Sequence, residues 1–310
     1  MDDGDVMQQA AEERDADRPM PAIRSDSIAS QADGEPGLCV TCGGRHRSHW
    51  ENEMEYPFIY AIGRVEHRFP TIGIEKELAQ ALGRATPNGL TDQRAVYEAL
   101  KEHTYLARRM CYVMIIGGLE TYILRPRDQT DLSLLIEAIR PRSGLGDLDA
   151  VVGVRGPIAP ADMCNGLMVP IVMFDQLYSF DTDSLRRSIP RPDDIEEDQY
   201  LETADDVLRR IMQMADNAGA TDEDRALNYL ALRYQRIYSA TAEAFGRNES
   251  LTAIEVRPAP LATTRKQVDV ILSYTNRGTD VTEKFAIRVD VTEAFPFLVT
   301  KLSPYLDRLN

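Results

Sequence analysis

The chain has 310 residues and a formal net charge of −15, with 43% apolar and 27% charged side chains. This length allows one large domain or two ordinary ones, and the composition is that of a soluble globular protein. The acidic balance repels nucleic acid and anionic lipid, so neither is an expected partner. No apolar run approaches the ~18 residues of a membrane span and no secretory signal pattern is present, so the cytoplasm is the expected compartment.

Residues 1–37 differ in composition from the rest of the chain. They contain ten acidic residues against three arginines and have no aromatic side chain. A segment with so few apolar groups cannot offset the conformational entropy lost on ordering. The sequence therefore predicts a disordered acidic arm over 1–37, followed by one domain over 38–310.

The first half of this domain is predicted to alternate strands and helices. FIYAIGRVEHRF (58–69) is rich in aromatic and β-branched residues, which indicates a strand. The apolar runs of residues 106–124 flank Gly117-Gly118, a pair typical of a tight hairpin. Helical patterns are predicted for 71–83 with Thr71 as the N-cap, from Thr91 or Asp92 onward, and for 128–139.

Two further strands, 149–156 and 169–180, enclose the segment PIAPADMCNGLM at 157–168. Pro157 and Gly166 disfavour regular structure in that segment. A shaped loop is therefore expected there, held between two rigid strands.

The clearest helical patterns are 198–217 and 221–245, with Gly219 between them. Thr221 and Asp224 resemble a capping box at the start of the second helix. Strand character returns after these helices in LTAIEVRP, KQVDVILSYTN and TEKFAIRVDVT. The sequence thus predicts an α+β fold, a single large domain with a mostly antiparallel sheet and a central helical pair.

The stretch CVTCGGRHRSHW at 39–50 most resembles a chemical motif. A redox CxxC pair normally opens a helix, whose N-terminus lowers the thiol pKa, whereas Gly43 and Gly44 break a helix. Glycine after the second cysteine suits a metal knuckle instead. We therefore expect a zinc knuckle near the N-terminus rather than a thioredoxin-like site.

A closed zinc site needs four ligands, and the chain has four cysteines: Cys39, Cys42, Cys111 and Cys164. We expect these to bind one structural zinc ion and to tie the first ordered segment to the sheet and the 157–168 loop. Two alternatives stay open, namely a site completed by His46 or His49 and no metal at all. A closed site has no free coordination position, so the metal is not expected to be catalytic.

Recognisable enzyme signatures are absent from the sequence. It contains no phosphate loop, dinucleotide fingerprint, nucleophile elbow or HExxH motif. The histidines are expected at surface positions rather than as catalytic bases: His46, His49, His67 and His103. No catalytic residue is therefore predicted.

The 155–165 segment is where a peptide-binding or unfamiliar catalytic site is expected, because loops on rigid strands often carry function. Its candidate residues, with one from the following strand, are Arg155, Asp162, Asn165 and Asp175. Arg64 and Glu66 of the first strand are expected nearby. The competing interpretation is a structural loop held by Cys164 on zinc.

Long blocks of the sequence closely resemble one known domain. They are YAIGRVEHRFPTIGIEKELAQALGRA, GLETYILRPRD, VVGVRGPIAPADMCNGLMVPIVMFDQLYSFD, RIMQMADNAGATDEDRALNYLALRY and RVDVTEAFPFLVTKLSPYLDR. From about Cys39 onward the chain resembles the C-terminal domain of the cyanobactin-biosynthesis protein PatG, which recurs at the end of its partner PatA.

The resemblance implies a pathway rather than a reaction. The protease and oxidase domains of the family lie upstream of this domain, whose own function is unknown, so no catalytic residue can be transferred. It implies an accessory role in making ribosomal, post-translationally modified peptides, with precursor peptide or modifying enzymes as partners. A homodimer formed through exposed strand edges is a further expectation.

Overall fold

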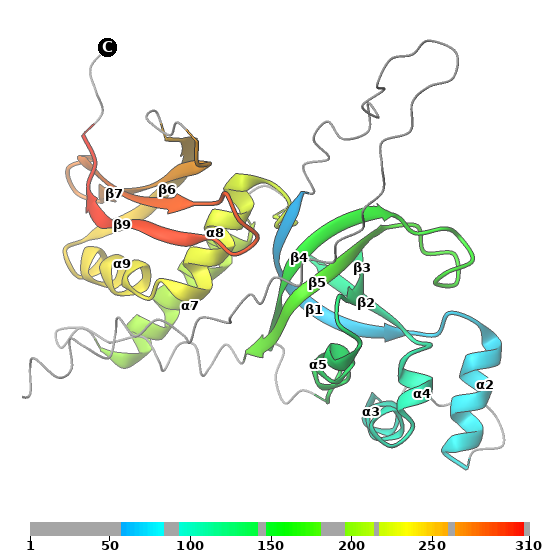
Figure 1. Ribbon diagram of the computed structural model, residues 1–310. Coiled ribbons are helices and arrows are strands. Elements are labelled where there is room, and N and C mark those ends of the chain that lie inside the picture. The colour runs from blue at the N-terminus through cyan, green and yellow to red at the C-terminus, as the bar shows by residue number, and fades with distance from the viewer. Residues whose placement is uncertain are drawn as a thin grey trace, which may run out of the picture. The chain divides into compact units, whose positions relative to one another are not determined.

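The computed structural model describes residues 57–83, 93–141, 147–180, 196–213, 217–259 and 264–306. All of these belong to one compact unit, Glu55–Asn310. The unit has an α+β fold with two mostly antiparallel sheets, which confirms the predicted class (Figure 1). The predicted acidic arm and zinc knuckle lie outside the described residues. No helix in the described ranges is long and apolar enough to cross a bilayer.

Five strands close into a barrel in the order β1-β2-β3-β5-β4. They are β1 (Phe58–Arg68), β2 (Cys111–Ile116), β3 (Leu119–Pro126), β4 (Leu148–Ile158) and β5 (Pro170–Phe180). Strands β3 and β5 are parallel, and every other neighbouring pair is antiparallel. Gly63 and Gly153 allow the neighbouring strands of the barrel to lie close together, because a Cβ at either position would collide with the main chain of the adjacent strand.

The barrel interior and a group of short helices share one apolar core. Ile59 and Ala61 of β1 belong to this core with Tyr112 and Met114 of β2. The helices, which lie beside the barrel in Figure 1, add further buried side chains to this core. They are α2 (Ile72–Ala81), α3 (Gln93–Glu102), α4 (Thr104–Ala107) and α5 (Leu132–Ala138). The predicted cap is present, because the Thr71 side chain accepts a hydrogen bond from the Ile74 amide at 3.4 Å.

The predicted hairpin at Gly117-Gly118 is present between β2 and β3. Both glycines have positive φ, 58° and 84°, as a two-residue turn of this hand requires. The strand before the turn is shorter than the apolar run suggested, since residues 104–107 form helix α4. Cys111 therefore begins β2, whereas the sequence placed it in the middle of a strand.

A four-stranded antiparallel sheet follows in the order β6-β7-β8-β9. Its strands are β6 (Glu249–Pro258), β7 (Gln267–Asn276), β8 (Thr282–Asp290) and β9 (Phe297–Pro304). Helices α7 (Glu197–Gln213), α8 (Asp222–Arg233) and α9 (Arg236–Gly246) contribute to the same core as this sheet (Figure 1). The sequence analysis predicted the first three strands and missed β9.

The helix predicted over 221–245 is in fact two helices. Its start is as predicted, because the Asp224 amide donates to the Thr221 side chain at 3.0 Å. The chain leaves helical geometry at Tyr234, whose φ of −117° and ψ of 83° end α8. The Tyr234 hydroxyl accepts a hydrogen bond from the Leu302 amide at 2.9 Å, so this break is held by a contact with β9.

The segment before α8 packs against the first strand of the barrel. The Tyr60 amide donates to the Gly219 carbonyl at 2.9 Å, and the Asn228 side chain donates to the Tyr60 carbonyl at 2.7 Å. Asn217 and Asn228 exchange side-chain hydrogen bonds of 2.6 and 3.0 Å in the same buried region. These contacts satisfy buried main-chain groups and connect the two halves of the unit.

Candidate functional site

Two of the four predicted zinc ligands meet in the described structure. Cys111 and Cys164 form a disulfide, with their Cα atoms 6.0 Å apart. Both are fully buried, one at the start of β2 and the other in the loop between β4 and β5. Cys39 and Cys42 lie outside the described residues. In the part of the chain that the structure describes, no three His, Cys, Asp or Glu side chains form a metal-binding group.

The cysteine pair fits either a disulfide or one half of a zinc site. A Cα separation of 6.0 Å lies within the ~4.4–6.8 Å range of disulfides. Thiolates on one tetrahedral zinc ion, each ~2.3 Å from the metal, have sulfurs about 3.8 Å apart. Zinc binding therefore requires reduction of the disulfide and a small separation of the two side chains.

The 157–168 loop that carries Cys164 packs on the barrel. Its ends are joined by a hydrogen bond of 2.9 Å from the Ala159 amide to the Val169 carbonyl. Asn165 and Gly166 have φ values of 50° and 83°, which turn the chain sharply at the tip. Apolar side chains of the loop cover the strand residues Val113 and Ile123. The loop thus has the shaped, non-regular backbone that its sequence predicted.

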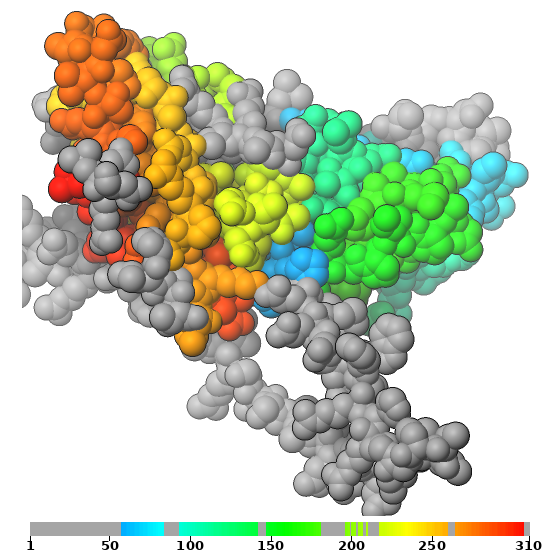
Figure 2. All heavy atoms as spheres, turned by 90° about the horizontal axis from the view of Figure 1, so that it is seen from above, coloured from blue at the N-terminus to red at the C-terminus, as the bar shows by residue number. Residues whose placement is uncertain are grey.

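The loop also presents apolar side chains to solvent. Ile158 and Met168 are each 61% exposed. Residues 147–180, which include this loop, form the bright green surface in Figure 2. Hydrophobic exposure at a well-formed loop is compatible with a contact surface.

In the described part of the chain, the four predicted polar residues of this region form no hydrogen bond or ion pair with one another, and two of them bond to other residues instead. Asp175 forms an ion pair of 2.8 Å with Arg127, and the carbonyl of Asn165 accepts from Arg68 at 3.2 Å. Arg155 and Asp162 are exposed. Within the described ranges, no hydrogen bond or ion pair joins any two of the four candidates.

The predicted neighbours on the first strand lie on β1. Arg64 pairs in register with Ile115 and is partly buried, whereas Glu66 pairs with Val113 and is exposed. The β1 residue that contacts the loop is Arg68, whose guanidinium also pairs with Glu120 at 2.6 Å. The loop is therefore held to β1 by Arg68, a residue that the sequence analysis did not single out.

A part-buried tyrosine pair links β1, β5 and α8. The hydroxyl oxygens of Tyr60 and Tyr178 are 2.5 Å apart, and the Arg233 guanidinium lies 5.0 Å from the Tyr178 ring centroid. Burial raises the pKa of both phenols above their ordinary value. Both hydroxyls stay protonated at neutral pH, so the pair is suited to hydrogen bonding and not to acting as a base.

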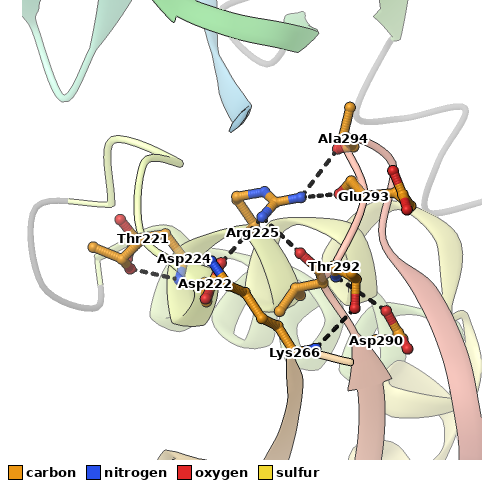
Figure 3. A network of polar contacts seen from close by, with 10 residues as sticks. Thr221, Asp222, Asp224, Arg225, Lys266, Asp290, Thr292, Glu293 and Ala294 are labelled. Carbon is orange, nitrogen blue, oxygen red and sulfur yellow. Dashed lines mark hydrogen bonds and ion pairs between the residues drawn. The ribbon is translucent and has the colours of Figure 1, made fainter. Parts of the chain in front are cut away.

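Arg225 is the centre of a polar network on α8 (Figure 3). It is 2% exposed, and it donates to the carbonyls of Val291 at 2.9 Å, Glu293 and Ala294. It also pairs with Asp222 at 3.1 Å. Burial lowers the pKa of Arg225, and the Asp222 carboxylate opposes that shift. Its role in this geometry is to fix the connection between β8 and β9.

One cavity, of about 250 Å³, combines positive charge with an apolar wall. Arg108 follows α4 and Arg125 lies on β3, and both line the cavity. The wall also includes Tyr112 of β2 and Leu132 and Leu135 of α5. Sequence reasoning missed this site, because an isolated arginine on a strand carries no periodic or motif signal.

The comparisons with known proteins bear on the family. Residues 194–305 match the family model described as PatG C-terminal. The predicted resemblance to the PatG C-terminal domain is confirmed. A solved structure described as "PatG Domain of Unknown Function" has a TM-score of 0.67 to this chain and is 20% identical to it. The alignment covers 81% of this chain and 99% of that PatG chain. No curated protein matches the chain.

Proposed function

We propose that the chain is an accessory domain in the biosynthesis of ribosomally made, post-translationally modified peptides of the cyanobactin type. In this role it binds the precursor peptide or docks the enzymes that modify it. The observation that carries the proposal is the likeness to the PatG domain, which extends over 99% of that domain. The PatG C-terminal match at residues 194–305 supports the same assignment from sequence.

The edge of the second sheet is compatible with peptide binding. Strand β9 is last in the order of the described sheet. Phe297 and Val299, two residues apart on β9, are 41% and 42% exposed. Sheet edges accept extended peptides through main-chain hydrogen bonds, and alternate side chains provide selectivity. A precursor peptide therefore has both backbone groups and apolar side chains to contact here.

Calorimetric titration with the precursor peptide encoded beside the gene tests this proposal. We expect saturable binding of the precursor and none of a scrambled peptide of the same composition. The cluster's modifying enzymes form the second arm and are tested by co-elution. If the chain binds neither the precursor nor any of these enzymes, the proposed function is wrong.

A structural zinc ion on Cys39, Cys42, Cys111 and Cys164 is the second part of the proposal. Its support is the contact between Cys111 and Cys164, together with a CxxC pair whose following glycines suit a metal knuckle. A closed four-thiolate site would stabilise the native state, because the unfolded chain binds the metal less well.

Zinc content of the reduced protein tests the metal site. We expect about one zinc ion per chain under reducing conditions and a loss of metal after oxidation, which removes two thiolates. Cys39→Ser is expected to lower both the zinc content and the melting temperature, whereas Thr41→Ala, between the two cysteines of the same CxxC motif, should leave both unchanged. Metal-free reduced protein that melts normally would exclude the site.

A peptide-modifying activity around residues 155–165 is the competing function. It is favoured by the exposed side chains of Arg155 and Asp162, which form no hydrogen bond or ion pair within the described ranges. Mass spectrometry of the precursor after incubation with the chain alone separates the alternatives. An unchanged mass supports an accessory role, whereas a changed mass supports the enzyme.

A further inference from the structure

The cavity between β3, α4 and α5 has an excess of positive charge that no acidic side chain of the described residues neutralises. Arg108 and Arg125 line it, and the lining residues among those that the structure describes include no acid. In the described part of the chain, neither guanidinium forms a hydrogen bond or an ion pair. Arg125 is partly buried, and burial lowers its pKa below the ordinary value. A desolvated cation without a partner is costly, so an anion in this cavity would be stabilised.

Two acidic residues near Arg125 are engaged elsewhere: Asp128 follows it in the sequence, and Asp175 lies on β5 close to Met173, which pairs in register with Arg125. Asp128 accepts hydrogen bonds of 2.9 Å from the amide and the hydroxyl of Thr130. Asp175 pairs with Arg127 at 2.8 Å. These contacts leave the guanidinium of Arg125 available to a ligand, and planar guanidinium groups bind carboxylates through two parallel hydrogen bonds.

The rest of the cavity wall is mostly apolar and therefore favours an apolar group on the ligand. Leu124, Leu132, Leu135 and Met173 line it beside the arginines. The Tyr112 hydroxyl already donates to the Ala107 carbonyl at 3.1 Å, so this phenol proton is occupied. A ligand that fits this surface carries a carboxylate next to an aliphatic side chain.

The size of the cavity limits the ligand further. Its volume of about 250 Å³ is below the roughly 300–1,000 Å³ of typical small-molecule pockets. It is suited to one aliphatic residue rather than to a large organic molecule. The C-terminal residue of a peptide has this size and places a carboxylate beside its side chain.

We propose that this cavity binds an apolar carboxylate, supplied by the C-terminal residue of a peptide. The choice of a peptide as the source rests on the proposed function. The same chemistry occurs in a small free acid such as 4-methylpentanoate, and the experiment separates these two sources.

Fluorescence anisotropy with the full chain and a labelled Gly-Ser-Ser-Ala-Leu peptide tests the proposal. The free acid is expected to bind about tenfold or more tightly than the C-terminal amide, because the amide loses the charge-assisted hydrogen bonds. Since this comparison uses the unaltered protein, it does not depend on any variant folding. Equal binding of the acid and the amide overturns the proposal.

Arginine variants locate the binding site. Arg125→Met is expected to weaken binding of the acid about tenfold or more, and the exposed Arg108 is expected to contribute less. The matched control is Arg109→Met, because Arg109 lies next to Arg108 but pairs with Glu77 at 2.7 Å outside the cavity. Unchanged binding by Arg125→Met overturns the assignment.

Competition with 4-methylpentanoate decides the source of the carboxylate. Weak competition by 4-methylpentanoate supports a peptide C-terminus as the ligand. If it competes as well as the unlabelled peptide does, the ligand is a small free acid and the peptide assignment is wrong. Failure of this inference is distinguishable from failure of the proposed function. If Arg125→Met binds the precursor as well as the unaltered protein does, the accessory role stands and the cavity assignment is wrong.

Discussion

Arg225 shows how one buried cation organises main chain that belongs to no regular element. Its guanidinium donates to three carbonyls in the connection after β8, so each hydrogen bond is assisted by charge. The pairing with Asp222 offsets part of the cost of burying the charge. Together with the hydrogen bonds of Val291 and Thr292 to the main chain of Lys266, this arrangement fixes the position of residues 291–294.

Arg225→Met is expected to lower the free energy of unfolding by about 2 kcal/mol, because the buried Val291 carbonyl and two part-buried carbonyls lose their donor. Urea titration followed by circular dichroism measures this change. Arg209→Met is the matched control, since Arg209 is 59% exposed and pairs only with Asp206 among the described contacts. Equal losses in the two variants would contradict a specific role for Arg225.

Asp290, at the end of β8, makes a pH-dependent contribution to the free energy of unfolding. Burial alone would raise its pKa, but hydrogen bonds from Arg265, Thr292 and Gln267 outweigh burial and lower the pKa to about 2. The folded value is below the ordinary value of 3.8, so the stabilisation is present above about pH 4. It is lost as the pH falls towards 2.

Asp290→Asn is expected to destabilise the protein by about 1–2 kcal/mol at neutral pH, a value reduced because Arg265 is half exposed and screened by water. The difference between the variant and the unaltered protein should shrink as the pH falls from 4 to about 2. Urea titrations at several pH values measure it, with the exposed Asp162→Asn as control. A difference that does not depend on pH would contradict this assignment.

At the scale of elements, the turn at Gly219 determines how the α7–α8 connection meets β1. Gly219 has a φ of 68°, and a Cβ there would collide with the main chain of Tyr60. Gly219→Ala is therefore expected to lower the free energy of unfolding by about 1–3 kcal/mol. Thermal unfolding measures the effect.

Gly246→Ala is the control for this prediction, because Gly246 ends α9 and a Cβ there meets no atom within 4 Å. Alanine favours a helix, so this control is expected to be neutral or slightly stabilising. If both variants behave alike, the close approach at Gly219 is not what limits the substitution.

Elements with local signals could be predicted from the sequence. Thr71 and Thr221 form the expected caps, and the Gly117-Gly118 pair forms the expected turn. Strand β9 lacked such a signal, because FPFLVTKLSP has no clean alternation and contains two prolines. The break at Tyr234 was also hidden, since the apolar spacing continues across it and the contact that stabilises it comes from β9.

The candidate-site residues also differ in whether they could be predicted from the sequence. Cys111 and Cys164 could be chosen because cysteines are few, and the structure joins them. Arg125 could not be chosen, because its partial burial and the absence of an acidic neighbour arise only when β3, α4 and α5 come together. Long-range packing, which a single sequence does not report, creates that site.

At the scale of the whole molecule, we predict that the chain self-associates through the edge of the second sheet. Strand β9 is last in the described sheet and exposes Phe297 and Val299, and such an edge can join the same edge of a second copy. We predict a dimer in light scattering, with Val299→Lys shifting the equilibrium towards monomer. Val281→Lys introduces the same charge at a residue that is 60% exposed and outside β9, and should have no effect. A monomeric mass at all concentrations would contradict this prediction.

The closure of the barrel has a consequence for synthesis on the ribosome. Strand β1 pairs with β2 and with β4, so its hydrogen bonding stays incomplete until residue 158, the end of β4, has emerged. That interval spans about 90 residues after the end of β1, or roughly 5–18 s at ordinary translation rates. During it the apolar segment FIYAI is exposed in the nascent chain. Overproduction should therefore benefit from added chaperone, which protects this first strand until its last partner arrives.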